Sequence, residues 1–160
     1  MEHVWTVLTE RIITDKKTNQ VSLIDTVEEI KAVFPPGPVQ VYPIPFDAWF
    51  VSLWTRSDAT KPEKGRFRIS WIGPAGEILI PPRPEGEELD LTEKIRVRIS
   101  THMISVPSNG NGRYNYIVEQ EIEAQWVRVA KIPVDVTIEE EEPKKSWKLV
   151  VETPKARVNR

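Results

Sequence analysis

Apolar and polar residues alternate with a period of two along much of this chain. The clearest case is residues 66–72, where Phe67, Ile69 and Trp71 share one face and arginine and serine occupy the other. Such alternation is typical of a β-strand with one face in a core and the other in water. Similar short segments recur between turn-forming residues. The pattern predicts an all-β protein, an antiparallel β-sandwich of about eight strands.

One strand departs from this alternation. Residues 46–56 are apolar on both faces, with Trp54 on one face and Trp49 on the other. A central strand that is covered on both faces has this pattern, and so does a strand whose outer face meets another subunit. We therefore predict a homo-oligomer that forms through this strand.

Residues 25–34 fit two kinds of element. Asp25 and Glu28 have the spacing of a capping box, and Val27 and Ile30 repeat every three residues, as in a short helix. The β-branched residues of the segment and the prolines that follow it favour a strand. Strand is the preferred interpretation, with helix as the alternative.

Proline and glycine mark the connections. Residues 34–45 and 81–88 are proline-rich, so both should be stiff and extended. We interpret the first as a crossover between two sheets, with a polyproline ligand as the alternative. The Asn-Gly repeat at 108–112 predicts a β-hairpin. Past Met103 the apolar parity shifts to Ile104 and Val106, and this one-residue shift predicts a β-bulge.

A symmetric hairpin would place His102 opposite Glu119. Arg96 and Arg98 lie on the same polar face of the first strand as His102. We interpret these basic side chains and the glutamates opposite them as a ladder of opposite charges that fixes the strand register. The functional alternative is an acid–base group made of His102, Glu119 and Glu121, which requires a cleft.

The alternating pattern ends at Glu139. We therefore divide the chain into a β-sandwich domain, 1–138, and a charged C-terminal tail, 139–160, expected to be solvated and mobile. Residues 146–152 contain Trp147 and a short apolar patch, and they are the candidate for a docking strand.

Composition limits the functions that fit. The chain has 160 residues, no cysteine and a formal net charge of −2, so it fits one domain without disulfides and is a poor match for nucleic acid. No apolar run is long enough for a membrane span. The first residues lack the pattern of a signal peptide. We expect a soluble, cytoplasmic protein.

Motifs for chemistry are missing from the sequence. The chain has no nucleophile or phosphate-binding motif, and two histidines without cysteine disfavour a zinc site. We therefore predict no catalytic residue, no metal and no cofactor.

The six tryptophans give the best case for recognition, because interfaces favour tryptophan anchors. Most are expected in the core. The candidate binding residues are Trp49, Trp54, Trp126, Trp147, Arg96, Arg98, His102 and Glu119.

Several short motifs span the chain from residue 4 to residue 138. They are residues 21–24, 46–51, 73–77, 112–114 with Val118, and 132–134. In this arrangement the chain resembles a family of uncharacterised bacterial proteins, a domain of unknown function. The resemblance implies an immunoglobulin-like or C2-like sandwich and no catalytic residues. The proline-rich insertions and the tail depart from the family pattern.

These observations predict a non-catalytic binding or assembly module that acts through exposed strand faces and proline-rich loops. An unknown protein partner is the expected ligand. The alternatives are a carbohydrate-binding β-sandwich and a hydrolase with an unrecognised site.

Overall fold

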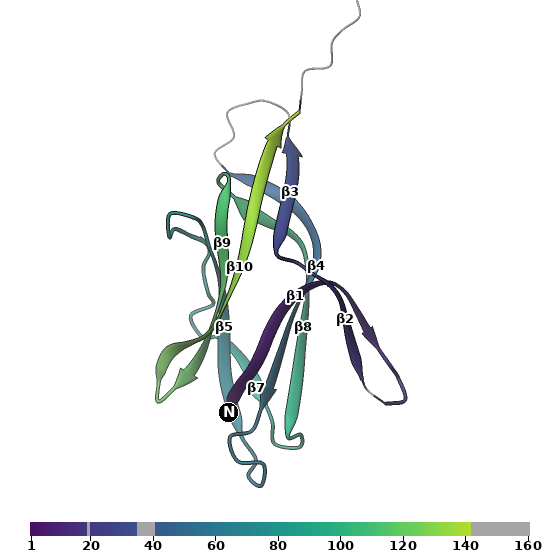
Figure 1. Ribbon diagram of the computed structural model, residues 1–160. Coiled ribbons are helices and arrows are strands. Elements are labelled where there is room, and N and C mark those ends of the chain that lie inside the picture. Colours follow the sequence, from purple (N-terminus) through teal and green to yellow (C-terminus); the bar gives the residue numbers. More distant parts are fainter. Residues whose placement is uncertain (19, 35–40, 142–160) are drawn as a thin grey trace, which may run out of the picture.

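The computed structural model describes residues 1–18, 20–34 and 41–141, and this part of the chain is all-β, without a helix (Figure 1). Its strands are β1 (Glu2–Thr14), β2 (Val21–Thr26), β3 (Glu29–Phe34), β4 (Tyr42–Thr55), β5 (Lys64–Ile72), β6 (Ile78–Ile80), β7 (Glu87–Asp90), β8 (Arg96–Ser108), β9 (Gly112–Ile122) and β10 (Gln125–Glu140). The all-β prediction is confirmed, but the described residues form ten strands rather than about eight. The last two residues of the predicted proline-rich loop 81–88, Glu87 and Glu88, belong instead to β7.

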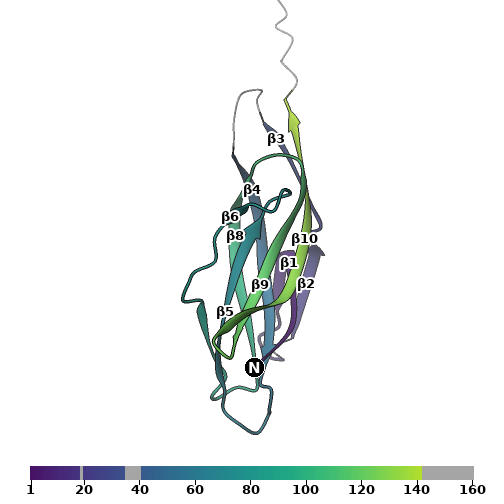
Figure 2. The ribbon, with the colours of Figure 1, turned by 90° about the vertical axis from the view of Figure 1, so that its left-hand side faces the viewer.

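The strands form two sheets along the long axis of an elongated molecule (Figures 1 and 2). Sheet A has the order β2-β1-β4-β8, and sheet B has the order β3-β10-β9-β5-β6, with β7 beside β5. Aromatic rings from the two sheets meet in the interior. The ring centroids of Trp54 and Phe67 are 5.4 Å apart, and those of Phe50 and Tyr116 are 6.0 Å apart. This arrangement is compatible with a sandwich.

Alternation correctly predicted which side chains of β5 form the core. In β5, Phe67 and Trp71 are buried and Ile69 packs against the core. In β4, the even-numbered residues from Ile44 to Trp54 are all buried. Burial of this apolar area is the main stabilising contribution to the fold.

A β-bulge is present where β8 pairs with β4, at the predicted place along β8, but the extra residue belongs to β4, since Phe46 and Asp47 lie opposite Ile104 alone. The register shifts between Met103 and Ser105 on β8, opposite Ala48 and Pro45 on β4. After the shift Val106 is buried, whereas Ile104 is 74% exposed.

The predicted hairpin at 108–112 is wrong. β8 belongs to sheet A and β9 to sheet B, so the segment carries the chain from one sheet to the other. Gly110 and Gly112 both have φ of 144°, as the turn signal required. The turn is closed by a tyrosine instead of by strand pairing: the Tyr114 hydroxyl lies 2.7 Å from the Gly110 carbonyl oxygen and 2.7 Å from the Ser108 hydroxyl.

Within residues 25–34, Asp25 and Thr26 end β2 and Glu29–Phe34 form β3, so the preferred strand interpretation is confirmed apart from the connection at Val27 and Glu28, and the helix alternative is wrong. Asp25, with φ of 57°, turns the chain at the end of β2. β3 then pairs in parallel with residues 135–140 of β10. The prediction of an antiparallel sandwich therefore fails for this pair, which joins distant parts of the chain.

The connection from β3 to β4 passes from sheet B to sheet A, as the crossover interpretation required. Its residues 35–40 lie outside the described part. Pro43 and Pro45 belong to β4 itself, opposite Pro107 and Ser105.

β10 continues past the predicted domain boundary at 138. The strand reaches Glu140, and the Glu141 amide donates a hydrogen bond of 2.8 Å to the Phe34 carbonyl. Residues 142–160, which hold most of the predicted tail, Trp147 and the docking strand at 146–152, lie outside the described residues.

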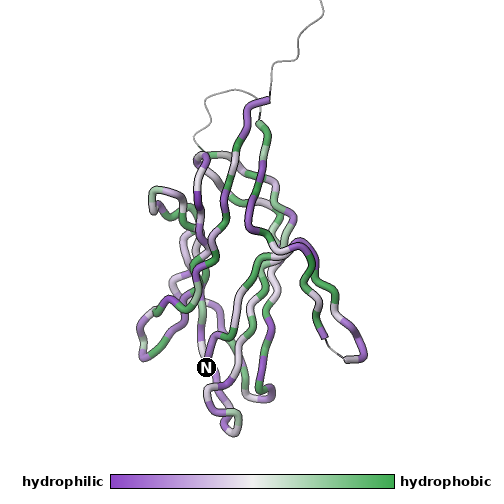
Figure 3. The backbone as a smooth tube through the Cα atoms, in the orientation of Figure 1, coloured by the Kyte–Doolittle hydropathy of each residue, from purple (hydrophilic) through white to green (hydrophobic). Residues whose placement is uncertain are grey.

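The hairpin of β1 and β2 extends away from the body of the molecule (Figures 1 and 3). Among the described strands β2 pairs with β1 alone, and Figure 3 shows hydrophobic residues along both strands. Ile13, near the tip, is 54% exposed. Within the ranges that the structure describes, no helix is long and apolar enough to cross a membrane.

Candidate functional site

The outer face of sheet A, turned away from sheet B, is apolar in its middle. In one cross-strand row Trp5, Leu53 and Arg98 lie side by side, and in the next Val7, Val51 and Ser100 do. A third row brings together Thr9, Trp49 and His102. We call the apolar set Trp5, Val7, Trp49, Val51 and Leu53 the outer apolar face.

The burial of Val51 shows that the side chains of the outer apolar face pack closely against one another. It is 0% exposed, although its parity points it away from sheet B. Its cross-strand neighbours are Val7 and Ser100, and Trp49 and Leu53 lie two residues away on the same strand face. Both faces of β4 therefore carry apolar side chains, as its sequence predicted.

One end of the outer apolar face carries an aromatic pair. The rings of Trp49 and His102 are stacked, with centroids 4.6 Å apart and planes 25° apart. His102 Nε2 lies 2.6 Å from Asp47 Oδ1. Asp47 sits in the β-bulge of β4, which places its carboxylate beside the His102 ring. The side chains of His102 and Asp47 are 42% and 90% exposed, so the pair is open to solvent.

The border of this face along β8 is positively charged. Arg96 and Arg98 project on the same side of the sheet as His102, opposite Thr55 and Leu53. Neither arginine forms an ion pair with another described residue. Both guanidinium groups could therefore form ion pairs with acidic groups of a binding partner.

Glu119 lies on the other side of the molecule, on the outer face of sheet B. Its Oε2 accepts a hydrogen bond of 2.7 Å from Arg68 Nε, and the Arg68 guanidinium lies 4.4 Å from the centre of the Trp126 ring. Trp126 also packs against Gly86, where an added Cβ would lie 2.5 Å from the ring. Arg68, Glu119 and Trp126 therefore form a half-buried cluster.

The predicted ladder between His102 and Glu119 is wrong, because β8 and β9 do not pair. Glu119 faces Arg68 on β5 and Arg128 on β10. The acid–base set of His102, Glu119 and Glu121 is divided between two sheets, so the hydrolase alternative loses the residues that supported it.

Trp54 is not a surface residue. Its side chain is 0% exposed and packs edge-on against His3, with centroids 4.9 Å apart. Its buried Nε1 has no hydrogen-bond partner among the described residues. The burial of Trp54 removes it from the candidate binding residues, and Trp147 lies outside the described part.

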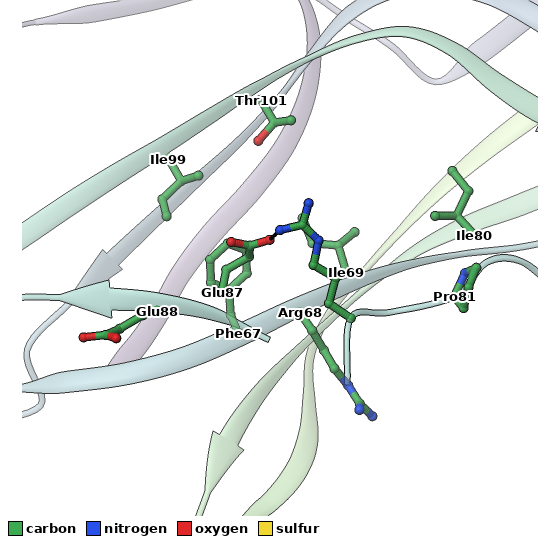
Figure 4. A pocket seen from close by; sticks show the side chains of 10 residues that line it. Phe67, Arg68, Ile69, Ile80, Pro81, Glu87, Glu88, Ile99 and Thr101 are labelled. Carbon is green, nitrogen blue, oxygen red and sulfur yellow. Dashed lines mark hydrogen bonds and ion pairs between the residues drawn. The ribbon is translucent and has the colours of Figure 1, made fainter. Parts of the chain in front are cut away.

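A cavity that the sequence did not reveal lies between the two sheets (Figure 4). It has a volume of about 620 Å³. Ile99 and Thr101 of β8 line one side, and Phe67, Ile69 and Ile80 of sheet B line another. We call it the inter-sheet cavity.

The second proline-rich loop borders the inter-sheet cavity. Pro81 and Arg83 line it, and the Arg83 guanidinium forms an ion pair with Glu87 (Figure 4). Arg68 points away from the other lining side chains, toward the Glu119 cluster. Within the described ranges no group of three or more acidic or histidine side chains is placed to hold a metal ion.

Comparisons with known proteins add little to these observations. No family model matches the chain, and no curated protein matches it. Among solved structures it is similar to the soluble domain of PmoD from Methylocystis sp. ATCC 49242 (Rockwell), with 14% identity over 84% of this chain and 95% of that chain. The TM-score is 0.28, too low to indicate a shared fold. The resemblance to a bacterial family of unknown function stays a prediction.

Proposed function

We propose that the protein is a non-catalytic binding or assembly module that uses the outer apolar face as its contact surface. The observation that carries the proposal is β4, which is apolar on both faces although, within the described residues, only one of them meets sheet B. Interfaces concentrate binding energy in tryptophan and arginine side chains surrounded by apolar neighbours. Trp5 and Trp49 supply the aromatic anchors here, and Arg98 and His102 supply a charged or polar border.

The ligand we propose is a protein surface, either another protein or a second copy of this chain. Contiguous apolar patches bordered by polar residues mark such contacts in soluble proteins. A second copy would place one outer apolar face on another and complete the second layer that the pattern of residues 46–56 predicted.

The test compares full-length wild type with Leu53→Lys and with Val127→Lys. Leu53 lies on the outer apolar face, whereas Val127 is an exposed apolar residue of β10. We expect sedimentation to show an association of the wild type that Leu53→Lys abolishes and Val127→Lys retains. For a heterologous partner, a protein that co-purifies with the wild type should be lost with Leu53→Lys alone. Equal effects of the two variants on both readouts would reject this surface.

A carbohydrate-binding sandwich is the second candidate. It is favoured by one observation, the stacked and partly exposed pair of Trp49 and His102. Sugars bind to aromatic rings of this kind through their apolar faces. Glycan titration with tryptophan fluorescence would show saturable quenching that Trp49→Ala removes. An unchanged spectrum across a broad glycan panel would reject this candidate.

The finer class of the fold remains part of the proposal. We propose an immunoglobulin-like or C2-like sandwich, supported by two sheets packed through one aromatic core. We also propose a bacterial, cytoplasmic module without a cofactor; the absence of cysteine is compatible with a reducing compartment.

A further inference from the structure

β8 forms one edge of sheet A. It pairs with β4 along its length, and no strand in the described part of the chain pairs with its other side. An edge strand presents unpaired backbone N–H and C=O groups on which another extended chain can add. Proteins often block such edges with inward-pointing charges or prolines. The inward positions of β8 beside the cavity carry neither, since they are Val97, Ile99, Thr101 and Met103.

The inter-sheet cavity lies beside β8, whose Ile99 and Thr101 line it (Figure 4). Alternate side chains of any strand that pairs with β8 would point toward sheet B, as Ile99 and Thr101 do. They would enter the cavity and contact Phe67, Ile69 and Ile80. Its volume of about 620 Å³ lies within the range of roughly 300–1,000 Å³ that is typical of ligand sites.

We propose that β8 and the inter-sheet cavity together bind an extended strand of a partner protein, which joins sheet A beside β8. In this mode of recognition, backbone hydrogen bonds supply affinity and side-chain pockets supply specificity. The cavity selects apolar side chains at every second position of the partner strand. This site is separate from the outer apolar face, so the two proposals can fail independently.

The charge along β8 predicts which residues of the partner strand lie between its apolar ones. These side chains would lie on the outward side of sheet A, next to Arg96 and Arg98, which have no ion-pair partner in the described residues. Opposite charges on neighbouring strands attract. The partner strand is therefore one in which apolar and acidic residues alternate.

The experiment uses a blocked peptide, Glu-Val-Glu-Ile-Glu-Val-Glu, and the full chain labelled with ¹⁵N. The control peptide has the same composition with the alternation removed, Glu-Glu-Glu-Ile-Val-Val-Glu. We expect the first peptide to shift the amide signals of residues 97–103 and to slow their hydrogen exchange. The control peptide at the same concentration should do neither. Failure of the first peptide to protect these amides would overturn the proposal.

Two neighbouring lysine substitutions locate the contact. Thr101→Lys places a charge in the cavity and should weaken binding roughly tenfold or more, since an unpaired charge is costly to bury. Ser100→Lys is the matched control, because Ser100 is exposed on the opposite face of the same strand. It should leave the affinity unchanged or raise it. Equal losses in the two variants would reject the cavity as part of the site.

Charge reversal tests the acidic preference. The double variant Arg96→Glu with Arg98→Glu should bind the acidic peptide roughly tenfold more weakly, since two attractions become repulsions. It should bind a peptide with lysine in place of each glutamate more tightly than the wild type does. An unchanged preference would overturn the charge assignment.

Hydrogen exchange of the protein without peptide shows whether another segment already occupies the edge of β8. If residues 97–103 are already protected in the full chain at every protein concentration, the chain's own residues 142–160 occupy the edge. If their protection rises with protein concentration, a second copy occupies it. Either result would overturn the assignment of this edge to a partner strand.

Discussion

The indole Nε1 of Trp71 donates a hydrogen bond of 2.8 Å to the carbonyl oxygen of Pro107. Trp71 belongs to β5 of sheet B and Pro107 to β8 of sheet A, so the bond links the two sheets inside the core. Trp54, the other fully buried tryptophan, has an Nε1 without a partner in the described residues. A comparison of Trp71 with Trp54 therefore separates the contribution of this hydrogen bond to stability from the contribution of ring burial.

Trp71→Phe should destabilise the protein more than Trp54→Phe does. Both changes remove the same part of a buried ring, but only Trp71→Phe leaves a carbonyl oxygen unpaired, at a cost of about 1–3 kcal/mol. Urea unfolding of the two variants measures the difference. Equal losses would mean that the bond to Pro107 contributes nothing to stability.

Tyr114→Phe should loosen the connection between β8 and β9. The Tyr114 hydroxyl accepts a hydrogen bond of 3.0 Å from the Asn109 amide in addition to its contacts with Gly110 and Ser108. We expect a loss of about 2–3 kcal/mol, since several groups become unpaired together. Tyr116→Phe is the control: among the described residues its hydroxyl has one hydrogen-bond partner, the weakly accepting Met103 Sδ at 3.2 Å. A thermal unfolding midpoint that drops equally in both variants would contradict this role.

Glu119 should couple energetically to Arg68 and not to His102. The Arg68 and Glu119 side chains are 20% and 22% exposed, and an ion pair with an added aromatic contact should give a coupling energy of about 1 kcal/mol. A double-mutant cycle with alanine at both positions measures it. The cycle of Glu119 with His102 should give no coupling, because the two residues lie on different sheets. Coupling in the second cycle would contradict the sheet assignment.

Acid should remove the stabilisation that Asp90 provides. The Lys64 ammonium, 2.8 Å away, and then Thr92 hold the pKa of Asp90 well below its usual range. A carboxylate with a lowered pKa stabilises the folded state above its unfolded pKa of about 4 and loses this effect as the pH falls further. Asp90→Asn should therefore lower stability at pH 7, and the difference from wild type should shrink below about pH 4.

The control for Asp90 is Glu85→Gln, an exposed carboxylate of the same region that forms no ion pair with the described residues. The unfolding midpoint of Glu85→Gln should equal that of the wild type both at pH 7 and below about pH 4. A pH-independent gap between Asp90→Asn and wild type would mean that packing, and not charge, accounts for the loss.

Burial within a strand was predictable because it follows from local alternation. Phe67 and Trp71 could be assigned to the core from seven neighbouring residues. Trp54 could not be assigned in this way, since both faces of residues 46–56 are apolar and parity does not say which face meets the second sheet. β7 was missed for a similar reason: Leu89 and Leu91 are isolated among acidic residues, although both are buried.

Strand pairing was not predictable from turn chemistry. The glycines at 110 and 112 required a turn, and a turn is present, but the same residues serve an arch between two sheets. The choice between hairpin and arch depends on which strands compete for each edge, and these strands are distant in sequence. The expected meeting of His102 with Glu119 failed for this reason, whereas the stacking of His102 on Trp49 depends on a pairing of β8 with β4 that no local signal contained.

The parallel pair of β3 and β10 has a consequence for how the chain acquires its structure. β3 lies near the beginning of the chain, and its partner is the last strand of the described residues. Pairings between such distant segments are slow to form because a long loop must close first. During synthesis β3 cannot pair in this way until β10, about a hundred residues later in the chain, has been made. Completion of sheet B therefore depends on residues 135–140, and the apolar side chain of Ile30, which is buried in the folded protein, stays exposed until they pair with β3.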